Sequence, residues 1–141
     1  MNRNPRHLPA LLWLLALAYC LASLAHFVHN AEFLRDYPNL PPWLSRSKVY
    51  LSWLGITAIG VVGIAFARTR FVIVGLLLVG VYAALGFDGL GHYALAPVSA
   101  HTLAMNATIW SEVAAAALLL LATLVYLLRQ IRHGSMLPRA A

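Results

Sequence analysis

Histidine and carboxylate side chains recur at helical spacing in this sequence. His26, His29 and Glu32 follow one another every three residues, which carries them across roughly 120° of one helix surface. Asp88 and His92 lie four residues apart, so a continuing helix would place one above the other. Imidazole and carboxylate groups bind transition metals and also exchange protons, so these residues are candidates for both kinds of chemistry.

A third group of this kind lies further along the chain. If Ser99 caps an early helix, then His101, Met105, Thr108 and Glu112 follow at spacings that form one continuous helical face. No basic residue is close to Glu112 in the sequence, so its partners must come from other helices. We expect histidines to supply them.

The elements that must position these residues are membrane helices. Of the 141 residues, 62% are hydrophobic and 10% are charged, well below the roughly 25% charge of a soluble domain. Four apolar stretches have about the 20 residues that a helix needs to cross a bilayer, and their lack of period-two alternation favours helices over strands. The predicted fold is an all-α bundle of four transmembrane helices in a single domain, residues 1–141, with helices at about 8–28, 49–67, 71–88 and 107–128.

Basic residues indicate how this bundle is oriented. Of the ten Lys and Arg residues, seven fall on one side of the predicted spans, which the positive-inside rule makes cytoplasmic, together with both termini. A strong excess of arginine over lysine, with abundant alanine and leucine, indicates a GC-rich bacterial genome and hence the cytoplasmic membrane. The first apolar stretch also fits a secretory signal, and the sequence leaves open whether it is cleaved. The seven basic residues are Arg3, Arg6, Arg68, Arg70, Arg129, Arg132 and Arg139.

The acidic residues are concentrated on the opposite, outward side. All four of them, Glu32, Asp36, Asp88 and Glu112, lie in the outward half, as do four of the six histidines. Counting back from the cytoplasmic helix ends places His26, Asp88 and Glu112 near the outer edge of the hydrocarbon. An ionisable side chain at that depth is costly unless it is paired, bound to an ion or open to water. We therefore expect a functional site at the outer interface.

The first hypothesis for this site is a transition-metal centre, because neutral imidazole and carboxylate are ligands of zinc, iron, manganese and copper. The candidates outnumber the three or four ligands that one ion needs, so a two-metal centre or additional orienting groups stay open. Asn30, Asn106 and Thr108 are expected to orient the ligands. Haem between two histidines is disfavoured, because axial ligation needs no concentration of carboxylates. The candidate ligands are His26, His29, Glu32, Asp88, His92, His101 and Glu112.

Two alternatives stay open beside the metal. The first is metal-free acid and base chemistry on a lipid-like substrate, with Glu32, Asp88 or Glu112 as the catalytic carboxylate. The pairs expected to exchange a proton are Asp88 with His92 and Glu112 with His101. The second alternative is a non-enzymatic structural or interaction subunit, in which contacts to another copy or to a membrane partner are the function. Its carboxylates would pair at the water boundary with Arg35, Arg46 and Lys48.

The segment His29-Asn30-Ala31-Glu32-Phe33, with the proline- and tryptophan-containing stretch after it, resembles the H-x-x-E-E segment of small bacterial membrane proteins known as the HXXEE family. The likeness covers about 15 residues, and Phe33 replaces the second glutamate. It implies a multi-helix membrane protein with an active site at His29 and Glu32. The stretch YPNLPPWL itself predicts a rigid, extended outer loop that could cover the site.

Charge and cysteine content disfavour several other classes. The formal net charge is +6, but the basic residues sit at the ends of the apolar stretches rather than in one patch, which argues against nucleic acid as a partner. A single cysteine, Cys20, allows no intramolecular disulfide and no Cys-x-x-Cys motif.

Overall fold

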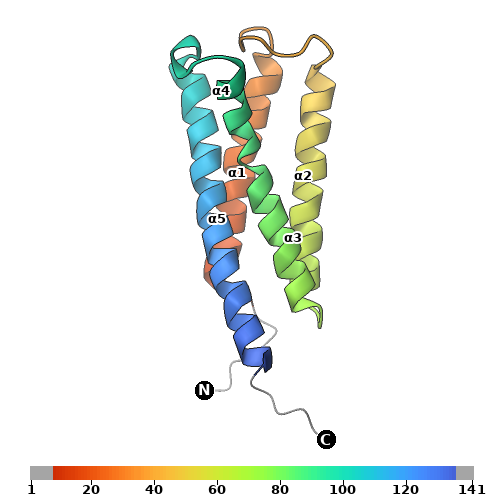
Figure 1. The fold of residues 1–141 in the computed structure, drawn as a ribbon. Coiled ribbons are helices and arrows are strands. Elements are labelled where there is room, and N and C mark those ends of the chain that lie inside the picture. The colour runs from red at the N-terminus through yellow and green to blue at the C-terminus, as the bar shows by residue number, and fades with distance from the viewer. Residues whose placement is uncertain (1–7, 136–141) are drawn as a thin grey trace, which may run out of the picture.

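The computed structural model describes residues 8–135, with side chains placed as far as residue 132. Arg3, Arg6, His7 and Arg139 lie outside the described residues, as does the side chain of His133. The described chain is all-helical and contains four segments that are long and apolar enough to cross a membrane, packed as a bundle (Figure 1). They are Ala10–Glu32, Arg46–Ala67, Val72–Leu95 and Leu103–Arg132. The protein is therefore an integral, multi-pass membrane protein in contact with the lipid bilayer.

Seven helical elements make up the four spans and their connections. The first two spans are the single helices α1 (Ala10–Glu32) and α2 (Arg46–Ala67). The third is broken into α3 (Val72–Leu85), the short 3-10 helix η1 (Asp88–Leu90) and α4 (Gly91–Leu95). A second 3-10 helix, η2 (Val98–Ala100), leads into α5 (Leu103–Ser135), which is the fourth span.

The observed helices are longer than the predicted ones at the end where the histidines lie. The helix α1 continues past residue 28 to Glu32, and the third span continues past residue 88 to Leu95. The expected cap at Ser99 is wrong, because that residue lies in η2. Thr102 takes its place, since its hydroxyl accepts a hydrogen bond of 3.2 Å from the backbone N–H of Met105.

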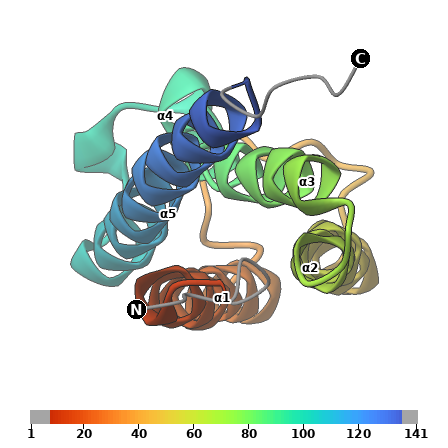
Figure 2. The same cartoon turned by 90° about the horizontal axis from the view of Figure 1, so that it is seen from below.

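Small residues allow the closest helix contact, between α2 and α3. A methyl group added at Gly75 would lie 2.1 Å from the backbone nitrogen of Ala67, and one at Gly63 would lie 2.8 Å from that of Val79. Only glycine at these positions lets the two backbones approach so closely. Seen along the bundle, α2 packs on α3 and α1 lies beside α5 (Figure 2). The pair α1 and α2 is left in looser contact.

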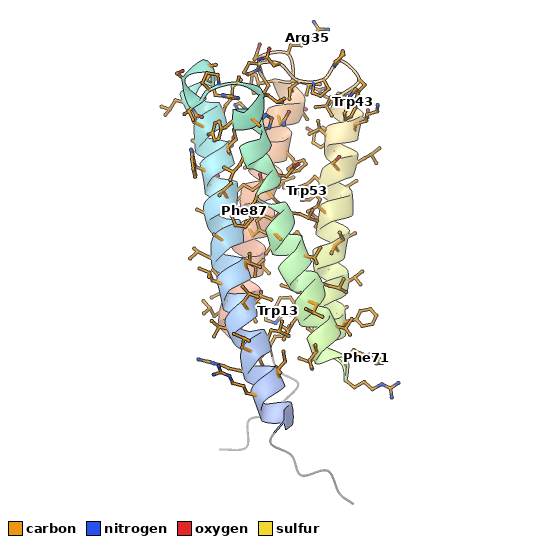
Figure 3. All side chains as sticks on the ribbon, viewed as in Figure 1. Trp13, Arg35, Trp43, Trp53, Phe71 and Phe87 are labelled. Carbon is orange, nitrogen blue, oxygen red and sulfur yellow. The ribbon has the colours of Figure 1, made fainter. Side chains whose placement is uncertain are left out.

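The two ends of the bundle differ in chemistry. The turn between α2 and α3 and the last turns of α5 lie at one end, which we call the arginine end (Arg68, Arg70, Arg129 and Arg132) (Figure 1). The loop between α1 and α2, with η1, α4 and η2, lies at the other end, which we call the histidine end (His26, His29, His92 and His101). Figure 3 shows Arg35 and Trp43 at the histidine end, and Trp13 and Phe71 toward the arginine end. This arrangement is the one that an even number of spans predicts.

Candidate functional site

A buried histidine and a buried glutamate meet inside the histidine end. His26 on α1 and Glu112 on α5 approach with Nε2 and Oε2 3.8 Å apart, and their side chains are 3% and 2% exposed. The sequence predicted that Glu112 takes a histidine partner from another helix, and this is confirmed. The separate prediction that Glu112 exchanges a proton with His101 is not matched by a contact, because the histidine within reach of Glu112 is His26.

Hydrogen bonds indicate how the His26 ring is oriented. The Thr108 hydroxyl donates to the carbonyl of Met105 at 3.0 Å, so it is an acceptor for the Nδ1–H of His26, 3.4 Å away. That tautomer leaves the lone pair of Nε2 facing Glu112. Oε2 of Glu112 has no hydrogen-bond partner among the described residues. A proton between Nε2 and Oε2 would give both atoms a partner, so the two groups are candidates for proton exchange.

A glycine on η1, Gly89, leaves room for the carboxyl group of Glu112. A methyl group at Gly89 would lie 3.2 Å from Oε2 of Glu112 and 3.9 Å from Nε2 of His26. One helical turn earlier, a methyl group at Gly86 would lie 2.7 Å from the Tyr19 hydroxyl. Spacing alone does not reveal this role, because a glycine-rich segment reads equally well as a helix break.

Two further imidazoles extend the cluster towards the loop. The side-chain amide of Asn30 donates to Nε2 of His92 at 3.0 Å, which leaves the ring proton of neutral His92 on Nδ1. His101 donates from Nδ1 to the carbonyl of Pro97 at 3.1 Å, so its Nε2 carries a lone pair. The centroid of the His92 ring lies 5.4 Å from that of His26 and 6.1 Å from that of His101. His92 Nδ1 and His101 Nε2 are both buried without a partner among the described residues.

The predicted orienting residues do hold parts of this cluster. Asn30 positions His92, and Thr108 positions His26. Asn106 accepts a hydrogen bond of 2.8 Å from the Tyr93 hydroxyl and donates to the carbonyls of Val98 and His101. It therefore anchors the connection that carries His101 rather than contacting the pair itself.

Glu32 lies outside the cluster, although the spacing predicted that it shares a site with His26. Its carboxylate pairs with Arg46 and accepts a hydrogen bond of 2.7 Å from the Tyr50 hydroxyl, both at the exposed surface. Six residues of helix turn the direction of a side chain by roughly 600°, which leaves Glu32 about 120° away from His26. His29, between them, contacts the Tyr37 hydroxyl at 2.9 Å. The pairing of Glu32 with Arg46 is the surface ion pair that the structural alternative predicted.

A cavity of about 360 Å³ opens beside the His26 ring. Its polar lining comes from His26, Asn30, Ser52, His92 and the exposed carboxylate of Asp88, and no Lys or Arg is among the lining residues. Among the described residues, neither a hydrogen bond nor an ion pair joins Asp88 to His92, so that predicted pair does not form. The apolar lining residues are Phe27, Leu40, Pro41, Trp43, Leu44, Val49 and Leu95.

The loop between α1 and α2 covers this site. The sequence YPNLPPWL had indicated a rigid outer loop that could do so. Asn39 has a positive φ of 57°, and its side chain donates to the carbonyl of Leu95 at 2.9 Å, which ties the loop to α4. Tyr37 is 3% exposed and places its ring 4.8 Å from that of His92. Burial raises the pKa of Tyr37 to about 12, so its hydroxyl keeps its proton at physiological pH. Sequence reasoning did not single out Tyr37, because aromatic residues are ordinary at a membrane interface.

The predicted metal centre has no support in the arrangement of the side chains. Within residues 8–132, no three His, Cys, Asp or Glu side chains come together as a group that could hold a metal ion. The seven candidate ligands instead divide into a buried cluster of four, His29 on the Tyr37 hydroxyl, a surface ion pair at Glu32 and the cavity-lining Asp88.

Comparison with known proteins does not assign the chain to a family. No family model, curated protein or solved structure matches it. The resemblance of the His29 to Phe33 segment to the HXXEE family stays a prediction, and the site must be interpreted from its own geometry.

Proposed function

We propose that the protein binds a lipid-like molecule in the cavity at the histidine end and that His26, backed by Glu112, transfers a proton to or from it. The observation that carries this proposal is the buried contact between Nε2 of His26 and Oε2 of Glu112, 3.8 Å apart, beside that cavity. A carboxylate inside the hydrocarbon is retained for function when no basic side chain neutralises it.

The two residues have different roles in this proposal. His26 lines the cavity, whereas Glu112 contacts His26 from α5 and is not among the lining residues. The imidazole is therefore the group that meets the ligand. Nε2, which carries the lone pair, takes up the ligand's proton, and the carboxylate of Glu112 beside it stabilises the imidazolium cation that forms. Thr108 holds the ring through Nδ1, so that Nε2 stays directed at the carboxyl group.

The cavity lining selects the class of ligand. Apolar side chains from α1, α2, α4 and the covering loop surround a few polar groups, which is the pattern of a site for an amphipathic molecule. Asp88 contributes negative charge, and the lining has no Lys or Arg to balance a phosphate. A neutral or positively charged polar group, such as an alcohol or an amine, fits this lining better than an anionic headgroup.

The site faces outward in this proposal. The arginine end carries the described basic residues Arg68, Arg70, Arg129 and Arg132, and the positive-inside rule places it in the cytoplasm. The cavity then opens at the outer interface of a bacterial cytoplasmic membrane, where lipids of the outer leaflet reach it.

A metal centre is the second candidate, because His101 Nε2 and Glu112 Oε2 are buried atoms with spare lone pairs. Imidazole nitrogen and carboxylate oxygen are good ligands for zinc, iron, manganese or copper. Side chains would have to rotate to bring three ligands to one point. We therefore rank it below the acid and base site.

The test is untargeted mass spectrometry of lipids. Purified protein in nanodiscs is incubated in D2O with total lipid extracted from bacterial membranes. We expect one lipid species to gain deuterium or change in mass with the wild type, and this change to disappear in Glu112→Gln and His26→Gln. Glu32→Gln, which alters an exposed carboxylate of the same bundle end, should behave as the wild type. A lipid profile identical for the wild type and Glu112→Gln would overturn the proposal.

A further inference from the structure

A second cavity, of about 330 Å³, lies between α1 and α2 nearer the arginine end. Its lining has no charged residue. Three of its lining residues, Leu14, Leu17 and Val61, are 64%, 57% and 63% exposed, so the cavity opens on the outer surface of the bundle where lipid lies. We call it the chain groove, lined by Trp13, Leu14, Ala16, Leu17, Cys20, Thr57, Gly60, Val61, Ile64 and Tyr82.

The chain groove and the cavity beside His26 share the same two helix faces. On α1, the groove residues Leu17 and Cys20 are followed at helical spacing by Ser23, Phe27 and Asn30, the last two of which line the cavity. Residues three or four apart lie above one another on a helix, so these five form one stripe.

The stripe on α2 runs in the opposite direction. Val49 and Ser52 line the cavity, and Gly60 and Ile64 line the groove further along the same helix. The looser contact between α1 and α2 leaves room for both openings along one seam. An extended molecule could therefore occupy them together.

Trp53 lies between the two openings. Its indole N–H donates to the Ser23 hydroxyl at 3.1 Å, which joins α2 to α1. Neither of these two residues lines the cavity or the chain groove. Figure 3 shows Trp53 between Trp43 at the histidine end and Trp13 towards the arginine end. The contact between Trp53 and Ser23 therefore lies on the seam, between the polar opening and the apolar one.

We infer that the alkyl chain of the lipid-like ligand lies in the chain groove, past Trp53, while its polar group occupies the cavity beside His26. This inference rests on the proposed function, because it assigns the apolar part of the same ligand. The eight residues from Thr57 to Ile64 span about 10 Å along α2, so the ligand must extend well beyond the cavity. An uncharged groove inside the hydrocarbon, in line with a polar cavity, matches a single-chain amphiphile in both charge and direction.

The inference is tested by photolabelling. The probe is a sixteen-carbon primary alcohol with a diazirine in the distal half of its chain, added to the protein in phosphatidylcholine nanodiscs. We expect saturable labelling of peptides that contain residues 13–20 and 57–64. Val61→Trp, which fills the groove from the lipid side, should lower this labelling about tenfold, or about 1.4 kcal/mol in binding.

Matched variants keep this result interpretable. Leu54→Trp makes the same kind of change at a residue of α2 that is 55% exposed and lines neither opening, and it should leave the labelling unchanged. Leu17→Trp blocks the groove from α1 and should repeat the effect of Val61→Trp, which guards against a folding defect in one variant. Labelling that does not saturate, or that spreads over all lipid-facing helices, would overturn the inference. Evidence that a second copy of the chain occupies the groove would overturn it as well.

The two proposals fail in different ways. Saturable labelling of the groove without any deuterium or mass change in the lipids would support the bound alkyl chain and contradict the proton transfer. A lipid change that survives Val61→Trp and Leu17→Trp, with no saturable labelling, would remove the groove and keep the chemistry.

Discussion

His26 on α1 and Glu112 on α5 are separated by 3.8 Å between Nε2 and Oε2, and both are buried where no basic residue lines the adjoining cavity. Thr108 contacts the other nitrogen of the ring, Nδ1, and so fixes the orientation of the His26 side chain towards Glu112. A buried pair of this kind is weak evidence for stability, because the cost of desolvation offsets the attraction. The proposed proton transfer gives this pair a role other than stability.

The pair should show strong energetic coupling. His26→Ala leaves the buried carboxyl group of Glu112 without a partner, so we expect a loss of about 1 to 3 kcal/mol in stability. The double variant His26→Ala with Glu112→Gln should recover part of that loss, because the group left unpaired is then no longer ionisable. Thermal unfolding in detergent micelles measures both. Strictly additive effects would show that the two side chains do not interact.

Gly89→Ala tests whether the position of Glu112 matters. The added methyl group would lie 3.2 Å from Oε2 and push the carboxyl group away from His26. We expect the lipid change in D2O to fall about tenfold, since small displacements of a catalytic group are costly to the rate. Gly55→Ala is the matched control, because nothing lies within 4 Å of its added methyl group and the residue lines neither cavity. Equal activity of the two variants would count against the assigned role.

Tyr37 gives a pH-dependent prediction. Its pKa is raised from an ordinary value of 10.0 to about 12 by burial, so its contribution to stability is complete below about pH 10 and is lost as the pH rises towards 12. The shift corresponds to roughly 2 to 3 kcal/mol. Wild type should lose more stability than Tyr37→Phe between pH 9 and 12, while at pH 7 the variant is weaker by about 1 kcal/mol through the lost contact with His29. Parallel unfolding profiles for the two proteins would contradict the burial of the phenol.

Metal content separates the two candidate functions. If His26 and Glu112 exchange protons without a metal, protein purified without a histidine tag should hold no stoichiometric zinc, iron, manganese or copper. Mass spectrometry of the elements provides the measurement, before and after titration with each metal. One bound equivalent that is lost in both His101→Ala and Glu112→Ala would favour the metal centre instead.

The sequence was enough to predict where the candidate site lies, but not which residues contact one another in it. Scarce acids and a one-sided distribution of histidines correctly indicated one end of the bundle. Glu112 and His26 were both among the candidates, and the need of Glu112 for a histidine from another helix was recognised. Glu32 was grouped with His26 but lies outside the buried cluster, because spacing along one helix does not reveal that Arg46 and Tyr50 of the next helix bind it.

The sequence by itself determined four membrane helices and their alternating directions, because lipid requires each apolar stretch to satisfy its own backbone hydrogen bonds. It also determined that ionisable groups gather at one end. Only the tertiary structure decided which of them meet, because the rotation of each helix about its axis depends on its neighbours. The absence of a side chain at Gly89 leaves room for the carboxyl group of Glu112 beside His26, and the loose contact of α1 with α2 leaves the cavity and the chain groove on one seam.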